Sequence, residues 1–295
     1  MDVLVASDLD RTLIYSDRAL ALAGPDRLAP RLLCVEVYQG RPLSFMTERA
    51  AALLADLARQ ARFVPSTTRT REQYERVGLP GPAPGRAPEY AICANGGQLL
   101  VDGVPDGDWR AEITARIAAG SAPLEEVVRR LALCADPEWT HKRRVADELF
   151  AYLVVDRAAL PAGWLAELTG WCAEHGWAVS LQGRKVYAVP APLTKSAALA
   201  EVVRRTGPTT VLAAGDSLLD ADLLLAADAG WRPGHGELAD SGWTAPGVTA
   251  LDEVGVAAGE EIVRRFLTGA GGGAGAGDGG AAGGVAPAGA PATAG

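Results

Sequence analysis

The chain has 295 residues, of which 48% are hydrophobic and 22% charged, an ordinary globular composition that allows a sizeable core. Its formal net charge of −8 at pH 7 argues against a nucleic-acid-binding protein, because such proteins present a broad basic face. Outside the glycine-rich C-terminal segment no apolar run reaches the roughly 18 residues of a membrane span, and the N-terminus lacks the features of a signal peptide.

The four cysteines, Cys34, Cys93, Cys134 and Cys172, are widely spaced and form no C-x-x-C pair. This spacing indicates neither a zinc site nor a redox dithiol. Buried free thiols in a reducing compartment are the simpler interpretation. We therefore expect a cytoplasmic protein with neither nucleic-acid nor membrane partners, whose protein partners the sequence does not reveal.

Short apolar runs in the first hundred residues predict strands that border loops and one helix. Residues 3–7 and 62–66 predict buried strands, and residues 45–60 predict an amphipathic helix. Residues 90–94 predict a further strand, which the turn signal Asn95-Gly96-Gly97 closes.

The composition of the sequence changes between about Trp109 and Gly183, where five of the seven tryptophans lie. The pattern predicts, in chain order, a helix, a strand, a second helix and two strands, at 124–134, 149–155, 161–175, 177–181 and 185–189. These elements indicate a small α+β unit inserted into the chain.

Strand–helix alternation then resumes. It predicts a helix capped by Thr194 and reaching Arg205, followed by a strand, a helix, a strand and a closing helix at 211–214, 217–227, 248–251 and 253–267. Short apolar strands alternating with helices favour an α/β fold, a Rossmann-like doubly wound parallel sheet.

The predicted domain organisation has three parts. Residues 1–105 and 184–268 form the catalytic core, and residues 106–183 form an inserted α+β cap domain. Residues 269–295 hold 12 of the 35 glycines and 10 alanines, and we expect them to be a disordered tail because they cannot bury enough apolar surface to offset their ordering entropy.

Polar residues follow the predicted strands, where parallel sheets bind their ligands. The stretch from Asp8 to Thr12 reads D-L-D-R-T and follows the first strand, and Thr67 follows the second. Lys195 opens a helix, and the stretch from Gly215 to Asp220 reads G-D-S-L-L-D and follows another strand.

The two carboxylates Asp8 and Asp10 would repel each other in one cleft, so a cation is expected beside them. Asp216, from a different strand end, would complete a set of hard oxygen ligands suited to Mg²⁺. Such a metal could neutralise a phosphoryl group and permit a carboxylate to attack it. Lys195 supplies a fixed positive charge, and Thr67 supplies a hydroxyl donor for a phosphoryl oxygen.

Each of these pieces alone is weak, because an isolated D-x-D is more often a turn or a surface pair and an isolated Gly-Asp-Ser is usually a helix cap. Their joint order is specific. It resembles the four motifs of the haloacid-dehalogenase-like (HAD) hydrolase superfamily, across about residues 3–225. The insertion is similar to the α/β (type II) cap of the Cof-type and sucrose-phosphate-phosphatase-like branch, and residues 90–97 and 186–195 resemble segments common in that branch.

The resemblance implies a HAD-like core and a Mg²⁺-dependent phosphatase that hydrolyses a small phosphorylated metabolite, with a sugar phosphate as the expected substrate. It implies that Asp8 is the nucleophile, which forms an aspartyl-phosphate, and that Asp10 protonates the leaving group and then activates water. Mg²⁺ would be held by the side chains of Asp8 and Asp216 and the backbone carbonyl of Asp10. Thr67 and Lys195 would grip the phosphoryl group.

Supporting roles are also implied. Asp220 would orient Lys195 or a metal-bound water, Thr12 completes the first motif, and the cap would close over the cleft and select the substrate. Arg11, Arg69 and Arg184 are the residues expected to reach the substrate itself.

The sequence departs from the family pattern at three places. Arg11 stands where the first motif usually has a glycine, so Arg11 must accept a tight turn or the loop must differ. Thr68 replaces the glycine of a Thr-Gly-Arg motif whose arginine, Arg69, is kept. Residues 234–236 read Gly-His-Gly where relatives often carry an asparagine near the phosphate.

Three alternatives remain at this stage. A phosphomutase would use the same nucleophile, because the motifs do not specify the acceptor of the transferred group. A D-x-D metal-dependent glycosyltransferase would leave Thr67, Lys195 and Asp216 unexplained. A non-catalytic HAD-like binding module would not need the complete set of acidic and cationic residues.

Overall fold

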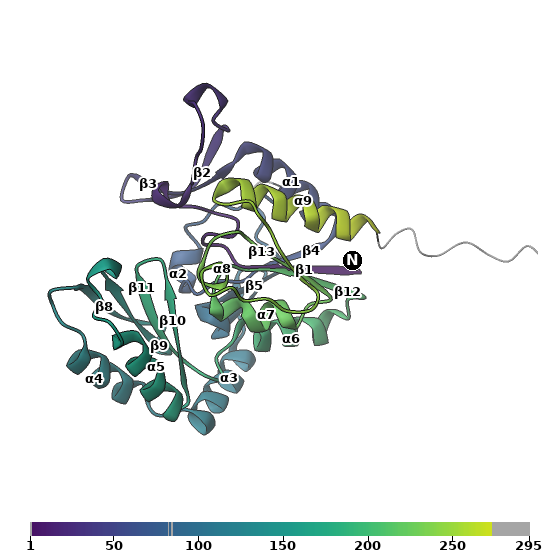
Figure 1. The fold of residues 1–295 in the computed structure, drawn as a ribbon. Coiled ribbons are helices and arrows are strands. Elements are labelled where there is room, and N and C mark those ends of the chain that lie inside the picture. Colours follow the sequence, from purple (N-terminus) through teal and green to yellow (C-terminus); the bar gives the residue numbers. More distant parts are fainter. Residues whose placement is uncertain (1, 82, 84, 273–295) are drawn as a thin grey trace, which may run out of the picture.

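The computed structural model describes residues 2–81, 83 and 85–272. At its centre is a five-stranded parallel sheet in the order β14-β13-β12-β1-β4 (Figure 1). Its strands are β1 (Val3–Ser7), β4 (Arg62–Pro65), β12 (Thr210–Ala214), β13 (Ala229–Arg232) and β14 (Val248–Ala250). All of β1 is buried between β12 and β4, which explains its continuous apolar run.

Helices cover both faces of this sheet, which confirms the doubly wound α/β fold. On one face α1 (Glu48–Gln60) packs against α9 (Val256–Gly272), and on the other α6 (Lys195–Thr206) packs against α7 (Ala221–Leu225) (Figure 1). The Thr194 hydroxyl caps α6 by accepting a hydrogen bond from the backbone N–H of Ala197 at 3.1 Å. This cap makes Lys195 the first residue of α6.

A small antiparallel sheet extends the edge of the core. It consists of β5 (Tyr90–Cys93), β6 (Gln98–Val101) and β7 (Val104–Pro105). A parallel bridge from Ser66 to Ile92 places β5 beside the end of β4. The backbone N–H of Thr67 donates to the Ile92 carbonyl at 2.8 Å, so this sheet fixes the loop that carries the second motif.

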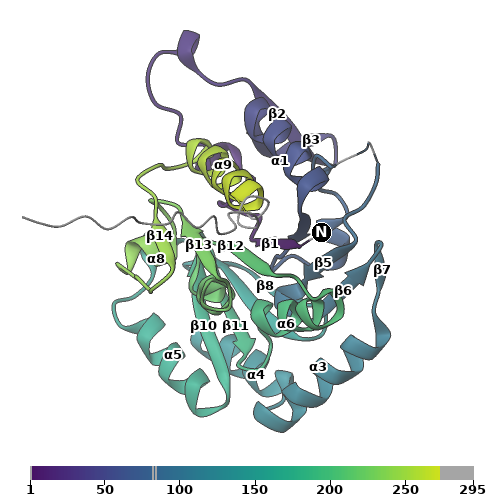
Figure 2. The same cartoon turned by 90° about the vertical axis from the view of Figure 1, so that its right-hand side faces the viewer.

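The cap is an antiparallel sheet in the order β10-β11-β9-β8, with helices on one face (Figures 1 and 2). Its elements are α3 (Gly107–Gly120), α4 (Leu124–Cys134), β8 (Thr140–Ala146), β9 (Phe150–Val155), α5 (Trp164–Glu174), β10 (Trp177–Gln182) and β11 (Lys185–Pro190). Helices α4 and α5 lie on the face of the sheet turned away from the core (Figures 1 and 2). Trp109, Trp164 and Trp177 are buried in this unit, and each indole N–H donates to a backbone carbonyl.

Two boundaries of the predicted organisation differ from the structure. Strand β11 pairs with both β9 and β10, so the cap sheet continues to Pro190 and past the predicted limit at residue 183. Helix α9 continues to Gly272, so residues 269–272 are helical although the sequence placed them in a disordered tail. The rest of the predicted tail, residues 273–295, lies outside the described residues.

A hairpin that the sequence did not predict rises beside α1 and α9 (Figures 1 and 2). It pairs β2 (Leu32–Tyr38) with β3 (Arg41–Thr47), so residues 45–47 are strand although the sequence assigned them to a helix. Helix α1 begins only after Thr47, whose hydroxyl accepts from the Ala50 N–H at 2.9 Å. The short helices α2 (Arg71–Tyr74) and α8 (Glu237–Asp240) complete the fold. Within the described ranges, no helix combines the length and the apolarity needed to cross a membrane.

Candidate active site

The predicted motif residues meet at the carboxyl ends of β1, β4 and β12. Asp8 follows β1, Thr67 lies just beyond β4, and Asp216 lies just beyond β12. The backbone N–H of Asp8 donates to the carbonyl of Ala214 at 2.9 Å, which ties the first loop to the end of β12. Parallel pairing of β1 with its two neighbours therefore brings distant parts of the sequence into one site.

Lys195 joins two buried carboxylates. Its Nζ lies 2.6 Å from Asp8 Oδ1 and 2.5 Å from Asp220 Oδ1, and all three side chains are buried. The other Asp220 oxygen accepts hydrogen bonds from the Ser217 hydroxyl and from the N–H groups of Asp216 and Ser217. Both Asp220 oxygens thus accept hydrogen bonds from the protein, and Lys195 lies between Asp220 and Asp8.

Both oxygens of the Asp8 carboxylate accept a hydrogen bond. The Thr12 hydroxyl donates to Asp8 Oδ2 at 3.0 Å, opposite the oxygen that pairs with Lys195. Burial raises the pKa of Asp8 to about 7, although the neighbouring Lys195 ammonium lowers it. The positive charge of Lys195 therefore favours the ionised form of Asp8.

Three carboxylates crowd this pocket. Ligand oxygens of Asp8, Asp216 and Asp220 all lie within 4.8 Å of one another. Burial, together with the charges of Asp8 and Asp220, raises the pKa of Asp216 well above its usual range. Asp216 Oδ2 accepts from Arg11 Nε at 3.0 Å, whereas Asp216 Oδ1 accepts no hydrogen bond from the described residues.

Arg11 occupies the position where a glycine is usual and adopts the left-handed conformation that a glycine would adopt, with φ of 66°. Its N–H donates to the Ile14 carbonyl at 2.8 Å, and its carbonyl accepts from His235 Nε2 at 2.8 Å. The loop therefore keeps its tight turn, and the Arg11 side chain bridges to Asp216 across the site.

Asp10 is held by Arg69, which the sequence analysis placed on the substrate. The Arg69 Nε and Nη2 atoms lie 2.7 Å and 2.8 Å from the two Asp10 oxygens, a bidentate pair. Partial desolvation raises the pKa of Asp10, but the charge and hydrogen bonds of Arg69 outweigh it and lower that pKa below its usual value. The Asp10 side chain remains 43% exposed.

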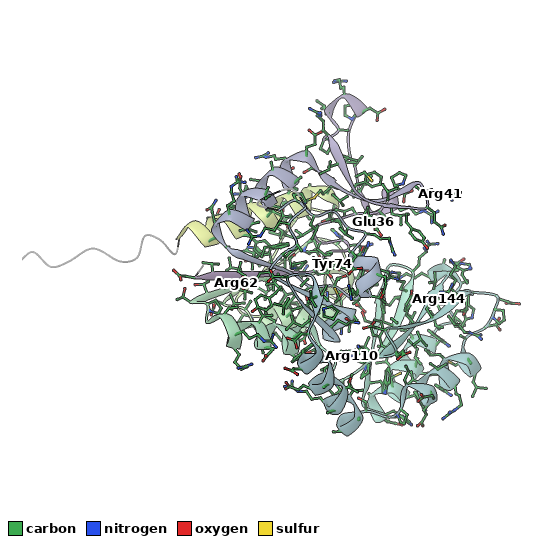
Figure 3. All side chains as sticks on the ribbon, turned by 180° about the vertical axis from the view of Figure 1, so that it is seen from behind. Glu36, Arg41, Arg62, Tyr74, Arg110 and Arg144 are labelled. Carbon is green, nitrogen blue, oxygen red and sulfur yellow. The ribbon has the colours of Figure 1, made fainter. Side chains whose placement is uncertain are left out.

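Glu36, from the unpredicted hairpin, completes this network. It is buried and accepts from Arg69 Nη1 at 2.8 Å, from Ser44 Oγ at 2.7 Å and from Arg76 Nε at 3.3 Å. The backbone of Glu36, labelled in Figure 3, forms an antiparallel bridge with Val77 just beyond α2. No motif pointed to Glu36, because its role depends on how the hairpin packs against the loop after β4.

Thr67 is fully buried, and its hydroxyl accepts from the Arg69 N–H at 3.1 Å, so the hydroxyl proton is available to another acceptor. The adjacent Thr68 lines the cavity described next. Thr68 therefore lies on the wall of the cavity, whereas Thr67 is buried behind that wall.

A cavity of about 240 Å³ lies between these loops and the cap. The core contributes Asp10, Arg11, Ser16, Thr68 and Asp216, and the cap contributes Val154, Gln182, Arg184, Lys185 and Tyr187. The structure thus places the predicted residues Arg11 and Arg184 on this cavity. Lys185 and Tyr187 lie there as well, on the first half of β11.

No protein-family model matches this chain, and no curated protein does so. Solved structures resemble it over nearly their whole length. The sucrose-phosphatase of Synechocystis sp., solved with sucrose and phosphate, is 19% identical, with a TM-score of 0.58 over 90% of this chain and 98% of that one. A protein of Thermoplasma acidophilum is 13% identical, with a TM-score of 0.54 over 90% of this chain and 99% of that one.

A sugar phosphatase of HAD subclass IIB is also 13% identical, with a TM-score of 0.52 over 90% of this chain and 99% of that one. The chain has the haloacid-dehalogenase-like fold. The similarity spans the cap as well as the core, since it covers 90% of the chain. This result confirms the fold that the motif order indicated.

Proposed function

We propose that this protein is a Mg²⁺-dependent phosphomonoester hydrolase that acts on a small phosphorylated metabolite, a sugar phosphate, through an aspartyl-phosphate intermediate. The observation that carries the proposal is the setting of Asp8, a buried carboxylate paired with Lys195 and hydrogen-bonded to Thr12. The structural resemblance to two sugar phosphatases supports it. The four free cysteines support a cytoplasmic location as part of the same proposal.

The donor set suits a magnesium ion. Buried carboxylates within 4.8 Å of one another repel, and Asp216 Oδ1 accepts no hydrogen bond from the described part of the chain, so it is free to act as a ligand. We propose that the side chains of Asp8 and Asp216 and the carbonyl of Asp10 hold Mg²⁺. Bound there, Mg²⁺ would offset phosphoryl charge as the carboxylate approaches.

In the first step an Asp8 oxygen attacks phosphorus, and the bond from phosphorus to the leaving oxygen breaks. The Thr67 hydroxyl donates a hydrogen bond to a phosphoryl oxygen, and the Lys195 ammonium balances the negative charge beside Asp8. Asp10 supplies the proton that the leaving oxygen takes. Because the Arg69 pair stabilises ionised Asp10, this pair must loosen for Asp10 to act as an acid.

In the second step water attacks the aspartyl-phosphate. Asp10, which the pair with Arg69 keeps ionised, accepts a proton from this water. The bond from phosphorus to Asp8 breaks, and phosphate leaves while Asp8 returns to its carboxylate form. Asp10 is then protonated again for the next cycle.

The test is release of inorganic phosphate from a panel of phosphorylated metabolites in Mg²⁺, with wild type, Asp8→Asn and a control. Asp8→Asn should lower kcat by several powers of ten, since the nucleophile is removed. Asp108→Asn is the matched control, because Asp108 is exposed on α3 in the cap. Turnover of Asp8→Asn at the wild-type rate would refute the proposal.

A further inference from the structure

One face of the cap sheet is turned toward the catalytic loops. Antiparallel register sets Lys142, Val154, Lys185 and Gln182 in one row across the four strands. Side chains that pair directly across antiparallel strands share a face of the sheet. Because Val154, Lys185 and Gln182 line the cavity, this row faces the core, while α4 and α5 cover the opposite face.

The next row on the same face holds Arg144, Tyr152, Tyr187 and Ser180. Figure 3 labels Arg144 on the cap sheet. The face therefore combines aromatic rings with several cations.

Lys185 is a partly buried cation that forms no ion pair with a carboxylate of the described residues, although the charge of Asp10 acts on it from a longer range. Its Nζ lies 5.7 Å from the centre of the Tyr152 ring and 5.9 Å from that of Tyr187. Among the described residues no carboxylate oxygen lies within 4.0 Å of this nitrogen, whereas Lys195 has two such partners. Desolvating an ammonium group is costly unless an anion balances it, so Lys185 is set to receive an anion.

The acidic groups on the core side of the cavity are already matched. Both oxygens of Asp10 pair with Arg69, and Asp216 pairs with Arg11. Arg184, next to Lys185 in the β10–β11 turn, is exposed, lines the same cavity and forms no ion pair with the described residues. The cap side of the cavity therefore carries excess positive charge.

The excess charge lies away from the group that is transferred. On the proposed function, the transferred phosphoryl group sits on the core beside Asp8, Thr67 and Lys195. Lys185 and Arg184 line the cavity from the cap, whereas the core lines it with Asp10, Arg11, Thr68 and Asp216. On the same proposal, the remainder of the substrate lies on the cap side of this cavity.

We propose that Lys185 and Arg184 bind a second anionic group on the part of the substrate that is not transferred. The substrate class is then a phosphomonoester that also carries a carboxylate or a second phosphate. This inference rests on the proposed phosphatase function and specifies the substrate of that same site.

The experiment compares three esters that share a six-carbon skeleton: glucose 6-phosphate, 6-phosphogluconate and glucose 1,6-bisphosphate. For wild type, kcat/KM should be at least about tenfold higher for one of the two esters that carry a second anionic group than for glucose 6-phosphate. That preference should fall about 10- to 100-fold in Lys185→Met, mainly through KM, which is the size of one hydrogen bond between charged groups. Which ester is preferred separates a carboxylate from a phosphate.

Two further variants make the result specific. Lys185→Arg keeps the charge and should restore most of the preference. Arg129→Met removes an exposed cation from α4, on the opposite face of the sheet, and should leave the preference unchanged. No preference in wild type, or an equal fall for all three esters in Lys185→Met, would overturn the inference.

A binding measurement separates this inference from the proposed function. Thermal shifts of Asp8→Asn protein with 6-phosphogluconate, glucose 1,6-bisphosphate and glucose 6-phosphate report binding without turnover. If wild type hydrolyses no ester, the phosphatase proposal fails. The second anion site is still supported if an ester with two anionic groups gives a larger thermal shift than glucose 6-phosphate and this difference disappears in Asp8→Asn/Lys185→Met. Equal shifts for the three esters would overturn the second anion site even if all three are hydrolysed.

Discussion

Replacing Asp216 by asparagine should stabilise the metal-free protein at neutral pH and weaken its response to Mg²⁺. Asp216 is buried, and its carboxylate lies within 4.8 Å of those of Asp8 and Asp220. Asparagine keeps the shape of the side chain and removes its charge. The prediction therefore isolates the electrostatic cost of assembling the proposed metal site.

The size of the effect follows from the distances. The carboxylate oxygens lie within 4.8 Å of one another, and two unit charges at that limiting separation repel by about 3.5 kcal/mol at an effective dielectric constant of about 20. Asp216 has two such neighbours, giving about 7 kcal/mol. The attraction between Asp216 and Arg11 at 3.0 Å offsets about 5.5 kcal/mol of this repulsion. Solvent screening reduces this attraction, because the Arg11 side chain is 35% exposed. A net gain of about 1–3 kcal/mol is expected for the variant, or roughly 3–8 °C in Tm.

The pH dependence determines which of the two proteins is the more stable at a given pH. The pKa of Asp216 is raised in the folded state, so its contribution to stability is fully present below about pH 4 and is lost as the pH rises. Asparagine has no such loss. Wild type and Asp216→Asn should therefore have similar Tm values near pH 4, and the variant should become the more stable protein toward pH 8.

Thermal unfolding in a chelator at pH 4, 6 and 8, and then in Mg²⁺ at pH 8, measures both effects. Mg²⁺ should raise the Tm of wild type more than that of Asp216→Asn. Asp108→Asn, on the exposed face of α3, controls for loss of one surface charge. A variant less stable than wild type at pH 8 in chelator, or a difference that does not vary with pH, would refute the reasoning.

Three further predictions follow from particular contacts. Glu36→Gln weakens the pairing of Arg69 and Arg76 and should cost about 2–4 kcal/mol in urea unfolding; an unchanged midpoint would contradict the proposed network. Gly236→Ala places a Cβ 2.6 Å from Asp216 Oδ2 at a φ of +95°, so it should cost about 1–3 kcal/mol and weaken Mg²⁺ binding measured by calorimetry, and unaltered binding would count against it. Arg11→Gly removes the pair with Asp216 and the left-handed arginine, and it should keep turnover while tightening Mg²⁺ binding; weaker binding would show that Arg11 supports the site.

The sequence predicted best those elements with a clear apolar pattern, which is continuous in a fully buried strand and one-sided in an amphipathic helix. Strand β1 spans the predicted residues 3–7, and helix α4 spans the predicted residues 124–134. Strand β8 escaped prediction because it is an edge strand, with five of its seven residues exposed and five polar residues before its first valine. Strand β2 also lacks a steady alternation, since its pairing with β3 shifts register twice.

The site was predictable to the extent that it depends on parallel strand ends. Asp8, Thr67 and Asp216 were expected at one edge of the sheet, and the topology brings them there. The partner of Asp10 was not predictable, because Arg69 could face either the substrate or the protein. Glu36 accepts a hydrogen bond from Arg69 and so helps to hold Arg69 toward the protein. The position of Glu36 depends on the packing of a hairpin, which no local sequence pattern encodes.

Two of the departures from the family pattern are physically linked. His235 Nδ1 accepts a hydrogen bond from the Gly255 N–H at 3.2 Å, so the proton of the neutral ring lies on Nε2. That Nε2–H donates to the Arg11 carbonyl at 2.8 Å, and burial lowers the pKa of His235, which favours this neutral ring. The left-handed turn at Arg11 is therefore held by His235, from the Gly-His-Gly stretch that departs from the family pattern.

This link explains how the loop dispenses with its glycine. A left-handed arginine costs backbone strain, of order 1 kcal/mol, which a hydrogen bond of similar size to a fixed imidazole can offset. In return the loop gains a side chain that reaches Asp216 and lines the cavity. Arg11 and His235 thus act as one structural unit, and neither substitution can be interpreted by comparing its own position alone.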